Sequence, residues 1–228
     1  MLRMMAVVLG VVTLTGCVST KAVPLQQGGV AALKGTRLTI TQRPKPAFTA
    51  GTAGKAMFGM IGATAMIVAG NHIIEKNAVE DPAVYIANTL AADLATEHAM
   101  TIVPAPGVVA ARGHASELSR LYTGADVVLD VETVNWSFVY FPSDFNNYRV
   151  IYSAKLRLID TKKRKVLAEG FCARVPEKSD SAPSYDELLA DQAARLKQEL
   201  KAGADHCIAD FRTRILLTSA GNAAPRLD

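Results

Sequence analysis

Four carboxylates lie close together in the sequence and are the residues best suited to acid–base chemistry: Asp126, Asp130, Glu132 and Asp144. Asp130 and Glu132 are two residues apart in a segment with the pattern of a β-strand, so their side chains share one face. A neighbouring pair of this kind can serve as general acid and general base, which makes a hydrolase one hypothesis. Carboxylates at this spacing are far more often the solvated face of a strand, and we favour that interpretation.

Other groups that could do chemistry are dispersed along the chain. The histidines are His72, His98, His114 and His206, and no two of them have the H-E-x-x-H spacing of a metal site. No serine lies in a G-x-S-x-G turn. We therefore expect a protein that is not an enzyme and that needs neither a metal nor a cofactor.

Cys17 is the one residue whose surroundings indicate a covalent modification. The chain begins MLRMMAVVLGVVTLTGC, with a positive charge at Arg3, an apolar run over residues 4–14 and small residues before the cysteine. This is the pattern of a secretory signal, and it is too short to span a bilayer. The alternative is a helix with a buried cysteine, which leaves the ordered succession of charge, apolar run and small residues unexplained.

The motif Leu14-Thr15-Gly16-Cys17 resembles the lipobox of bacterial lipoproteins. With this motif in place, the chain resembles the small lipoproteins of Proteobacteria. The resemblance implies that residues 1–16 are removed, that Cys17 receives acyl chains such as palmitate, and that these chains anchor the protein stably. Val18 stands where an Asp holds such proteins in the inner membrane. The resemblance thus implies an outer-membrane location, facing the periplasm.

The remaining cysteines, Cys172 and Cys207, would then lie in a compartment where disulfides persist. We favour one intramolecular disulfide between them over two buried free thiols. The net charge of the chain without residues 1–16 is +3, because Arg3 is the only charge lost from a total of +4. A charge this small and scattered predicts no nucleic-acid partner.

Residues 56–74 form an uncharged apolar segment that contains Met57, Met60 and Met66. Gly59 and Ala63 are four residues apart, a spacing of small residues that lets two helices approach closely. A segment apolar on all sides must be covered by protein or lipid. Three interpretations stay open: a buried helix or hairpin of the fold, which we favour, burial against another subunit, and insertion into a bilayer.

A stripe of aromatic residues comprises Trp136, Phe138 and Tyr140, which alternate along one predicted strand. They are candidates for a contact patch, although core packing is the more common role of such a stripe. The alternation changes phase near Thr133, which predicts a β-bulge there.

The elements that would position these residues follow from hydrophobic periodicity. Strands are predicted at 37–41, 100–103, 125–141, 150–160 and 166–175, and helices at 82–98, 115–122 and from 184. Asp81 with Pro82 marks one helix start, and Ser184 with Glu187 forms a capping box at another, while Gly203 is expected to break that last helix. The prediction is an α+β domain over 36–218, with helices packed on one mainly antiparallel sheet, a tether at 17–35 and a disordered tail at 219–228.

The order of helix 82–98, strand 100–103 and the stretch GADVVLDVETVNW is similar to the small α+β domain of the lipoprotein CsgG and of the TolB N-terminal domain. That resemblance implies a non-enzymatic envelope role. Our first hypothesis is a structural, assembly or interaction component that binds the membrane through its lipid and an envelope protein or a second copy through its surface. The alternative is a carrier module for an apolar ligand or lipid.

Overall fold

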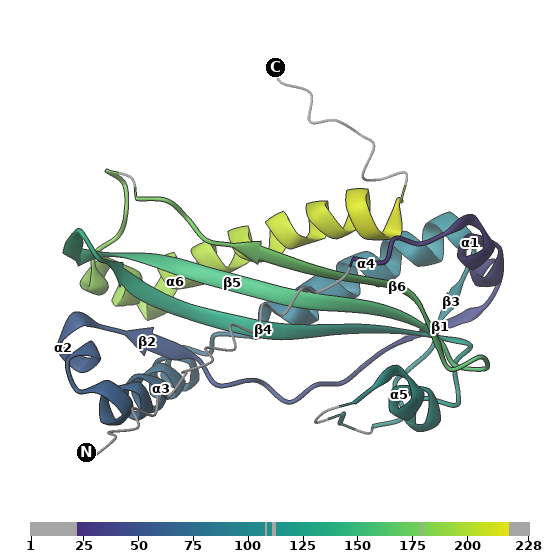
Figure 1. Ribbon diagram of the computed structural model, residues 1–228, viewed down its shortest axis with the longest axis horizontal. Helices are drawn as coiled ribbons and strands as arrows, with labels where there is room; N and C mark the ends of the chain where they lie inside the picture. The colour runs from purple at the N-terminus through teal and green to yellow at the C-terminus, as the bar shows by residue number, and fades with distance from the viewer. Residues whose placement is uncertain (1–21, 108, 111–112, 179, 219–228) are drawn as a thin grey trace, which may run out of the picture.

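The computed structural model describes residues 22–218 except 108, 111, 112 and 179 (Figure 1). The predicted signal peptide, the lipidation of Cys17 and the predicted tail from residue 219 lie outside the described residues. Those three expectations therefore stay predictions.

The described chain folds as an α+β domain around one mixed sheet of six strands. The strands are β1 (Arg37–Ile40), β2 (Thr49–Gly51), β3 (Thr101–Ile102), β4 (Val127–Phe141), β5 (Asp144–Asp160) and β6 (Lys165–Arg174). Their order is β3-β1-β4-β5-β6, and β2 lies beside the far part of β4. The long strands β4, β5 and β6 are antiparallel, as predicted, but β1 and β2 run parallel to β4. The sheet is therefore mixed because long crossovers connect the short strands to β4.

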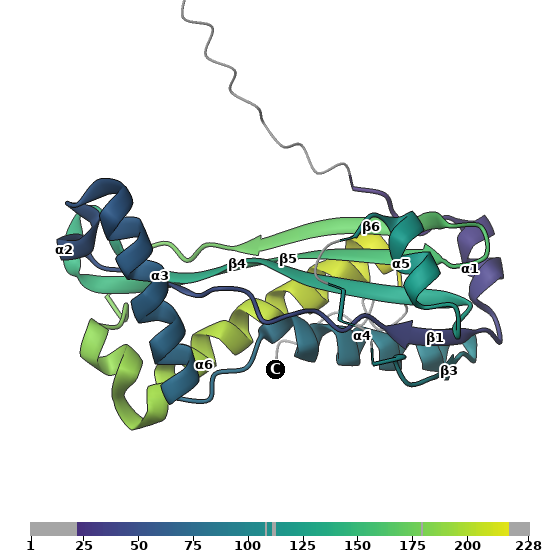
Figure 2. The same cartoon turned by 90° about the horizontal axis from the view of Figure 1, so that it is seen from below.

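Helices cover the two faces of the sheet unequally. Helices α4 (Pro82–His98) and α6 (Tyr185–Asp210), the latter continued by a π-helical turn (Phe211–Leu216), lie on one face (Figure 2). Helix α5 (Ala115–Leu121) lies on the opposite face at one end of the sheet. Helices α2 (Ala53–Ala56) and α3 (Gly59–Lys76) stand at the other end, beside β2 (Figure 1).

The core lies between the sheet and the pair α4 and α6. The predicted inward set of β5 is buried: Val150, Tyr152, Ala154, Leu156 and Leu158. On β4 the buried alternation shifts at a register irregularity between Thr133 and Asn135, so the predicted bulge is confirmed. The predicted helix starts are also confirmed, because Asp81 accepts a hydrogen bond from the Ala83 amide and Ser184 with Glu187 forms the capping box.

Helix α6 breaks at a different place from the one predicted. The backbone leaves the helical region over residues 190–193, whereas Gly203 lies inside regular helix. A Cβ at Gly203 would come within 2.8 Å of the Tyr152 Cβ, so the glycine is there to let α6 lie close on β5.

Residues 22–35 are packed on the domain, where a tether was predicted. Val23 pairs with Glu169 of β6, and Leu25 and Leu33 are buried at the two ends of helix α1 (Gln27–Leu33). The apolar side chains of this segment repeat too irregularly to indicate burial from the sequence alone. The rest of the predicted tether, residues 17–21, lies outside the described residues and stays a prediction.

The predicted disulfide between Cys172 of β6 and Cys207 of α6 is present, with the two Cα atoms 5.4 Å apart. It joins residues 35 apart in sequence and fixes α6 to the sheet edge. By the chain-entropy argument, a loop of this length stabilises the fold by about 4 kcal/mol.

Candidate interaction surface

The carboxylate Asp130 is buried within a cluster of donors, contrary to the prediction of a solvated face. Arg43 donates from Nε and Nη2 to the two carboxylate oxygens at 2.9 Å each. Arg157 donates from Nε at 2.9 Å and Nη2 at 2.6 Å, and the Thr41 hydroxyl donates at 2.8 Å. Asp130 is occupied by these five hydrogen bonds, which tie the chain after β1 to β4 and β5.

Glu132 shares the strand face with Asp130, as predicted, and completes the charge balance of this cluster. Its carboxylate lies 3.7 Å from the Arg43 guanidinium and is partly exposed. Two arginines therefore meet two carboxylates, which is the condition for burying such charges at a tolerable cost. The arrangement holds strands together, and its pairings are internal to the domain.

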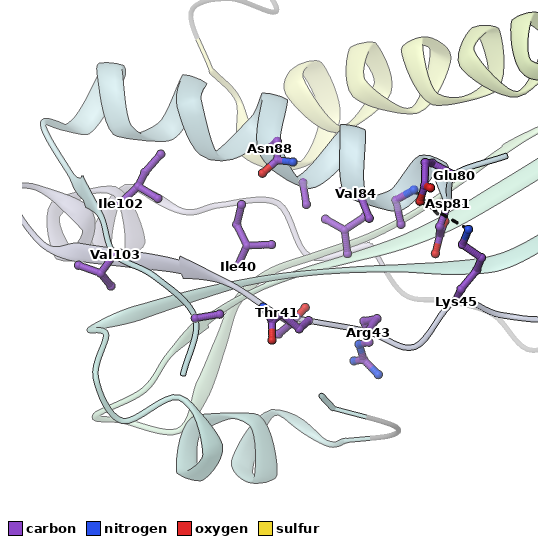
Figure 3. A pocket seen from close by; sticks show the side chains of 15 residues that line it. Ile40, Thr41, Arg43, Lys45, Glu80, Asp81, Val84, Asn88, Ile102 and Val103 are labelled. Atoms are coloured by element: carbon purple, nitrogen blue, oxygen red, sulfur yellow. Dashed lines mark hydrogen bonds and ion pairs between the residues drawn. The ribbon is translucent and has the colours of Figure 1, made fainter. Parts of the chain in front are cut away.

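A cavity of about 440 Å³ opens between α4 and β1 (Figure 3). Ile40 from β1 and Val84 from α4 face each other across it, with Ile102 at one end. At the other end the Lys45 ammonium lies 3.5 Å from the Glu80 carboxylate and donates to the Val79 carbonyl at 3.0 Å. The walls are mostly apolar, and the two opposite charges at this end are paired with each other.

Asp81 lies beside the rim of this cavity and links it to the core. The Thr133 hydroxyl hydrogen-bonds the Asp81 carboxylate and is 3.0 Å from the Tyr152 hydroxyl. Burial raises the pKa of Asp81, and the hydrogen bonds from Thr133 and the Ala83 amide offset this only in part. Burial also raises the pKa of Tyr152, so its hydroxyl stays protonated and can donate to Thr133.

The most exposed apolar residues of the described chain gather on α3 and on the two residues that connect α2 to it. Met57 is 85 % exposed, Met60 is 89 % exposed and Ile61 is 80 % exposed. Phe58 and Val68 are also exposed by more than half, and Ile67 by 40 %. We call this group the α2–α3 surface. Contiguous exposed apolar residues of this size are typical of a site that binds protein or lipid.

The α2–α3 surface is held against the sheet by contacts between α3 and the residues just before β2. Phe48 is fully buried and packs edge-on against Trp136 with ring centroids 5.2 Å apart. The Phe48 amide donates to the Asn71 side chain of α3 at 2.9 Å. A Cβ at Gly70 would lie 2.0 Å from the Phe48 carbonyl oxygen, so only glycine allows α3 to approach this closely.

The exposed part of α3 covers more than half of the helix circumference. At 100° per residue, the arc that runs from Ala63 through Met60 and Val68 to Ala65 spans about 200°. All of these residues are exposed, and residues 56–74 contain no charged side chain. The hydroxyl in the arc, that of Thr64, bonds back to the Met60 carbonyl at 3.4 Å.

The preferred interpretation of residues 56–74, a buried helix, is therefore wrong for most of the segment and right only for Gly62 and for residues near its end. Gly70, Ile73 and Ile74 are buried, whereas Met57, Gly59, Met60 and Ala63 are exposed and Met66 is half-buried. The close approaches occur at Gly62, against the Lys55 carbonyl, and at Gly70, whereas a Cβ at Gly59 would meet nothing within 4 Å. Phe58, Ile61 and Val68 were not singled out from the sequence, although they lie in the same uncharged segment, residues 56–74.

The aromatic candidates lie elsewhere. Trp136 and Phe138 are buried, so they cannot form a contact patch, and the interpretation as core is confirmed for both. Tyr140 is half-buried and packs edge-on against Phe145, which is exposed. Their phase on β4 directs Trp136 and Phe138 toward the α4 and α6 side, where Phe48 and Tyr185 cover them.

Two further kinds of site are absent from the described residues. Within the described ranges, no helix has both the length and the apolarity needed to cross a membrane. The same part of the chain holds no group of three or more His, Cys, Asp or Glu residues able to bind a metal ion.

Comparison with known proteins gives only distant likenesses. No known family and no curated protein matches the sequence. Among solved structures, the chain is similar to the lipoprotein GNA1162 from Neisseria meningitidis, with 17% identity over 76% of this chain and 98% of that one and a TM-score of 0.34. It is also similar to PelC from Paraburkholderia phytofirmans, solved as a dodecamer, with 15% identity over 86% of this chain and 96% of that one and a TM-score of 0.35. A third similar structure is the LpoB C-terminal domain from Salmonella enterica, with 14% identity over 63% of this chain and 84% of that one and a TM-score of 0.27. The resemblance to CsgG and TolB stays a prediction.

Proposed function

We propose that this chain is a lipid-anchored protein of the bacterial cell envelope that faces the periplasm from the outer membrane. Its role is structural, in assembly or in interaction, and it is not catalytic. The observation that supports this most strongly is the α2–α3 surface, where the start of α3 and the two residues before it expose Met57, Met60 and Ile61. An apolar surface of this kind is costly in water and indicates that something covers it in the cell.

The anchor in this proposal is the predicted lipid on Cys17. The test is the intact mass of the full-length gene product, purified from the membranes of a Gram-negative host, beside a Cys17→Ser variant. We expect the wild-type mass to correspond to a chain that starts at residue 17 and carries acyl chains, and we expect the variant to lose them and leave the membrane fraction. An unmodified Cys17 in membrane-bound wild-type protein would overturn the proposal.

A second candidate, a carrier for an apolar ligand, is favoured by the cavity between α4 and β1. Its volume of about 440 Å³ and its mostly apolar walls are suited to a small apolar molecule. The substitution Val84→Trp would fill part of the cavity from α4. If the protein is a carrier, native mass spectra of the wild type should retain a ligand that Val84→Trp loses. Identical spectra without ligand would eliminate this candidate.

A further inference from the structure

The end of the α2–α3 surface is a compact projection that we call the tip, residues 57–61. It comprises the residues between α2 and α3 and the first turn of α3, and its large side chains are exposed by 70 % or more. The Phe58 amide donates to the Lys55 carbonyl at 3.2 Å, and the Gly62 amide donates to the Phe58 carbonyl at 3.3 Å. The tip is therefore a folded structure that holds its apolar side chains outward.

The chain enters the domain at a fixed place, which limits how far the domain can move from its anchor. Val23 forms two backbone hydrogen bonds with Glu169, at 2.8 and 2.9 Å, and the Leu25 amide bonds the Ile215 carbonyl at 2.7 Å. Cys17 is six residues before Val23, so a lipid on Cys17 keeps the point of entry within about 20 Å of the bilayer. This step rests on the lipid anchor of the proposed function.

The tip and the point of entry lie on the same side of the sheet. In Figure 2 the first described residues, in purple, and α2 with the beginning of α3 lie above the sheet, whereas α4 and α6 lie below it. A bilayer that approaches the domain from the anchored side would therefore meet the tip as well. The two contacts are at opposite ends of the sheet and would together orient the domain.

The charge distribution agrees with a lipid surface. The first 74 residues contain no Asp or Glu, and the first acidic residue is Glu75, near the end of α3. Lys55 lies in α2, just before the tip, where a cation would meet the headgroups of anionic lipids. No acidic side chain within the tip or along α3 as far as residue 74 opposes its entry into the headgroup layer.

The breadth of the exposed arc distinguishes lipid from a protein partner. One flat protein surface covers one side of a helix, whereas acyl chains surround an inserted turn on all sides. We propose that the tip inserts into the leaflet that carries the N-terminal lipid, as a second, non-covalent membrane contact. The tip is short, and entry to the depth of the headgroup and acyl boundary is what such an element achieves.

The experiment places a fluorescent reporter at the tip of the full-length product. The chain has a single tryptophan, Trp136, which is 1 % exposed and serves as an internal background. The variant Phe58→Trp adds a reporter at the tip, and Tyr85→Trp adds one on α4 as the matched control, since Tyr85 is also exposed. Each protein is purified from membranes and reconstituted into vesicles of phosphatidylethanolamine and phosphatidylglycerol, with or without bromine on the acyl chains.

We expect brominated chains to quench the Phe58→Trp emission about twofold more than that of Tyr85→Trp, since the bromine lies at the depth that an inserted turn reaches. A second reporter, Met60→Trp, should behave like Phe58→Trp. Equal quenching at the tip and on α4 would overturn the proposal. So would a tip emission that is blue-shifted but not quenched, because a second copy or a protein partner would then cover the tip.

The intact mass of the same samples separates this inference from the proposed function. Acylated protein with an unquenched tip contradicts the inference alone. Protein without acyl chains contradicts the proposed anchor, whatever the tip does.

Discussion

Helices α3 and α4 are close in length and follow each other in the chain, yet they are buried to very different extents. Helix α4 carries Asp93 and Glu97 and still buries Ile86, Leu90 and Leu94. Helix α3 has no charge over its first sixteen residues and leaves most of them exposed. The more apolar helix is therefore the less buried one, so apolar composition alone does not place a helix in the core.

The difference comes from what lies beside each helix. Helix α4 lies on the sheet and against α6, so its apolar stripe meets side chains on two sides. Helix α3 rests on the three-residue strand β2 and the short α2. Its start also lacks a side-chain cap, whereas the start of α4 is capped by Asp81. We therefore expect α4 to contribute much of the free energy of unfolding and the exposed part of α3 to contribute little.

The largest expected effect tests this difference with matched truncations. Leu90 is fully buried on α4, so Leu90→Ala should lower the free energy of unfolding by about 2–5 kcal/mol. Ile61→Ala on α3 should change it by less than about 0.5 kcal/mol, because the side chain is already exposed. Urea unfolding followed by Trp136 fluorescence measures both. Similar losses for the two variants would break the comparison and place α3 in the cooperative core.

An intermediate effect is expected where α3 meets the sheet. A Cβ at Gly70 would collide with the Phe48 carbonyl, so Gly70→Ala should destabilise the protein by about 1–3 kcal/mol. Gly54→Ala in α2 is the control, because its Cβ would meet nothing within 4 Å and alanine favours a helix. The same unfolding experiment applies. If both substitutions are neutral, the close approach of Gly70 to the Phe48 carbonyl does not hold α3 against the sheet.

The smallest effect concerns the cap that distinguishes α4. Asp81→Ala removes the cap and should cost about 1 kcal/mol, while Asp81→Asn keeps an acceptor for the Ala83 amide and should cost less.

The pH dependence of Asp81→Asn follows from burial, which raises the folded-state pKa of Asp81 above its unfolded value of about 4. The folded protein then holds the proton more tightly, and the wild type loses stability as the pH rises from about 4 through the folded-state pKa. Asp81→Asn lacks that loss, so its stability relative to the wild type should increase over this range. A difference that stays constant from pH 4 to pH 7, measured by urea unfolding, would contradict this.

Much of the fold could be predicted from local patterns. The helix that begins after Asp81, the capping box at Ser184 and the bulge near Thr133 each depend on a few neighbouring residues, and all are confirmed. The disulfide partners were found because only two cysteines remain once Cys17 is set aside. The candidate surface was found in part, since Met57 and Met60 lie in a run whose lack of charge is visible in the sequence.

What only the tertiary structure decided was which neighbours each pattern would meet. Asp130 reads as a solvated strand residue, but Arg43 from the chain after β1 and Arg157 from β5 enclose it. Residues 56–74 read as a segment that must be covered, but the narrow β2 covers only one stripe of it. Alternation and caps are local properties and can be read from the sequence. Burial depends on the partners that long crossovers bring together. The order of those partners in the sequence does not reveal which of them come into contact.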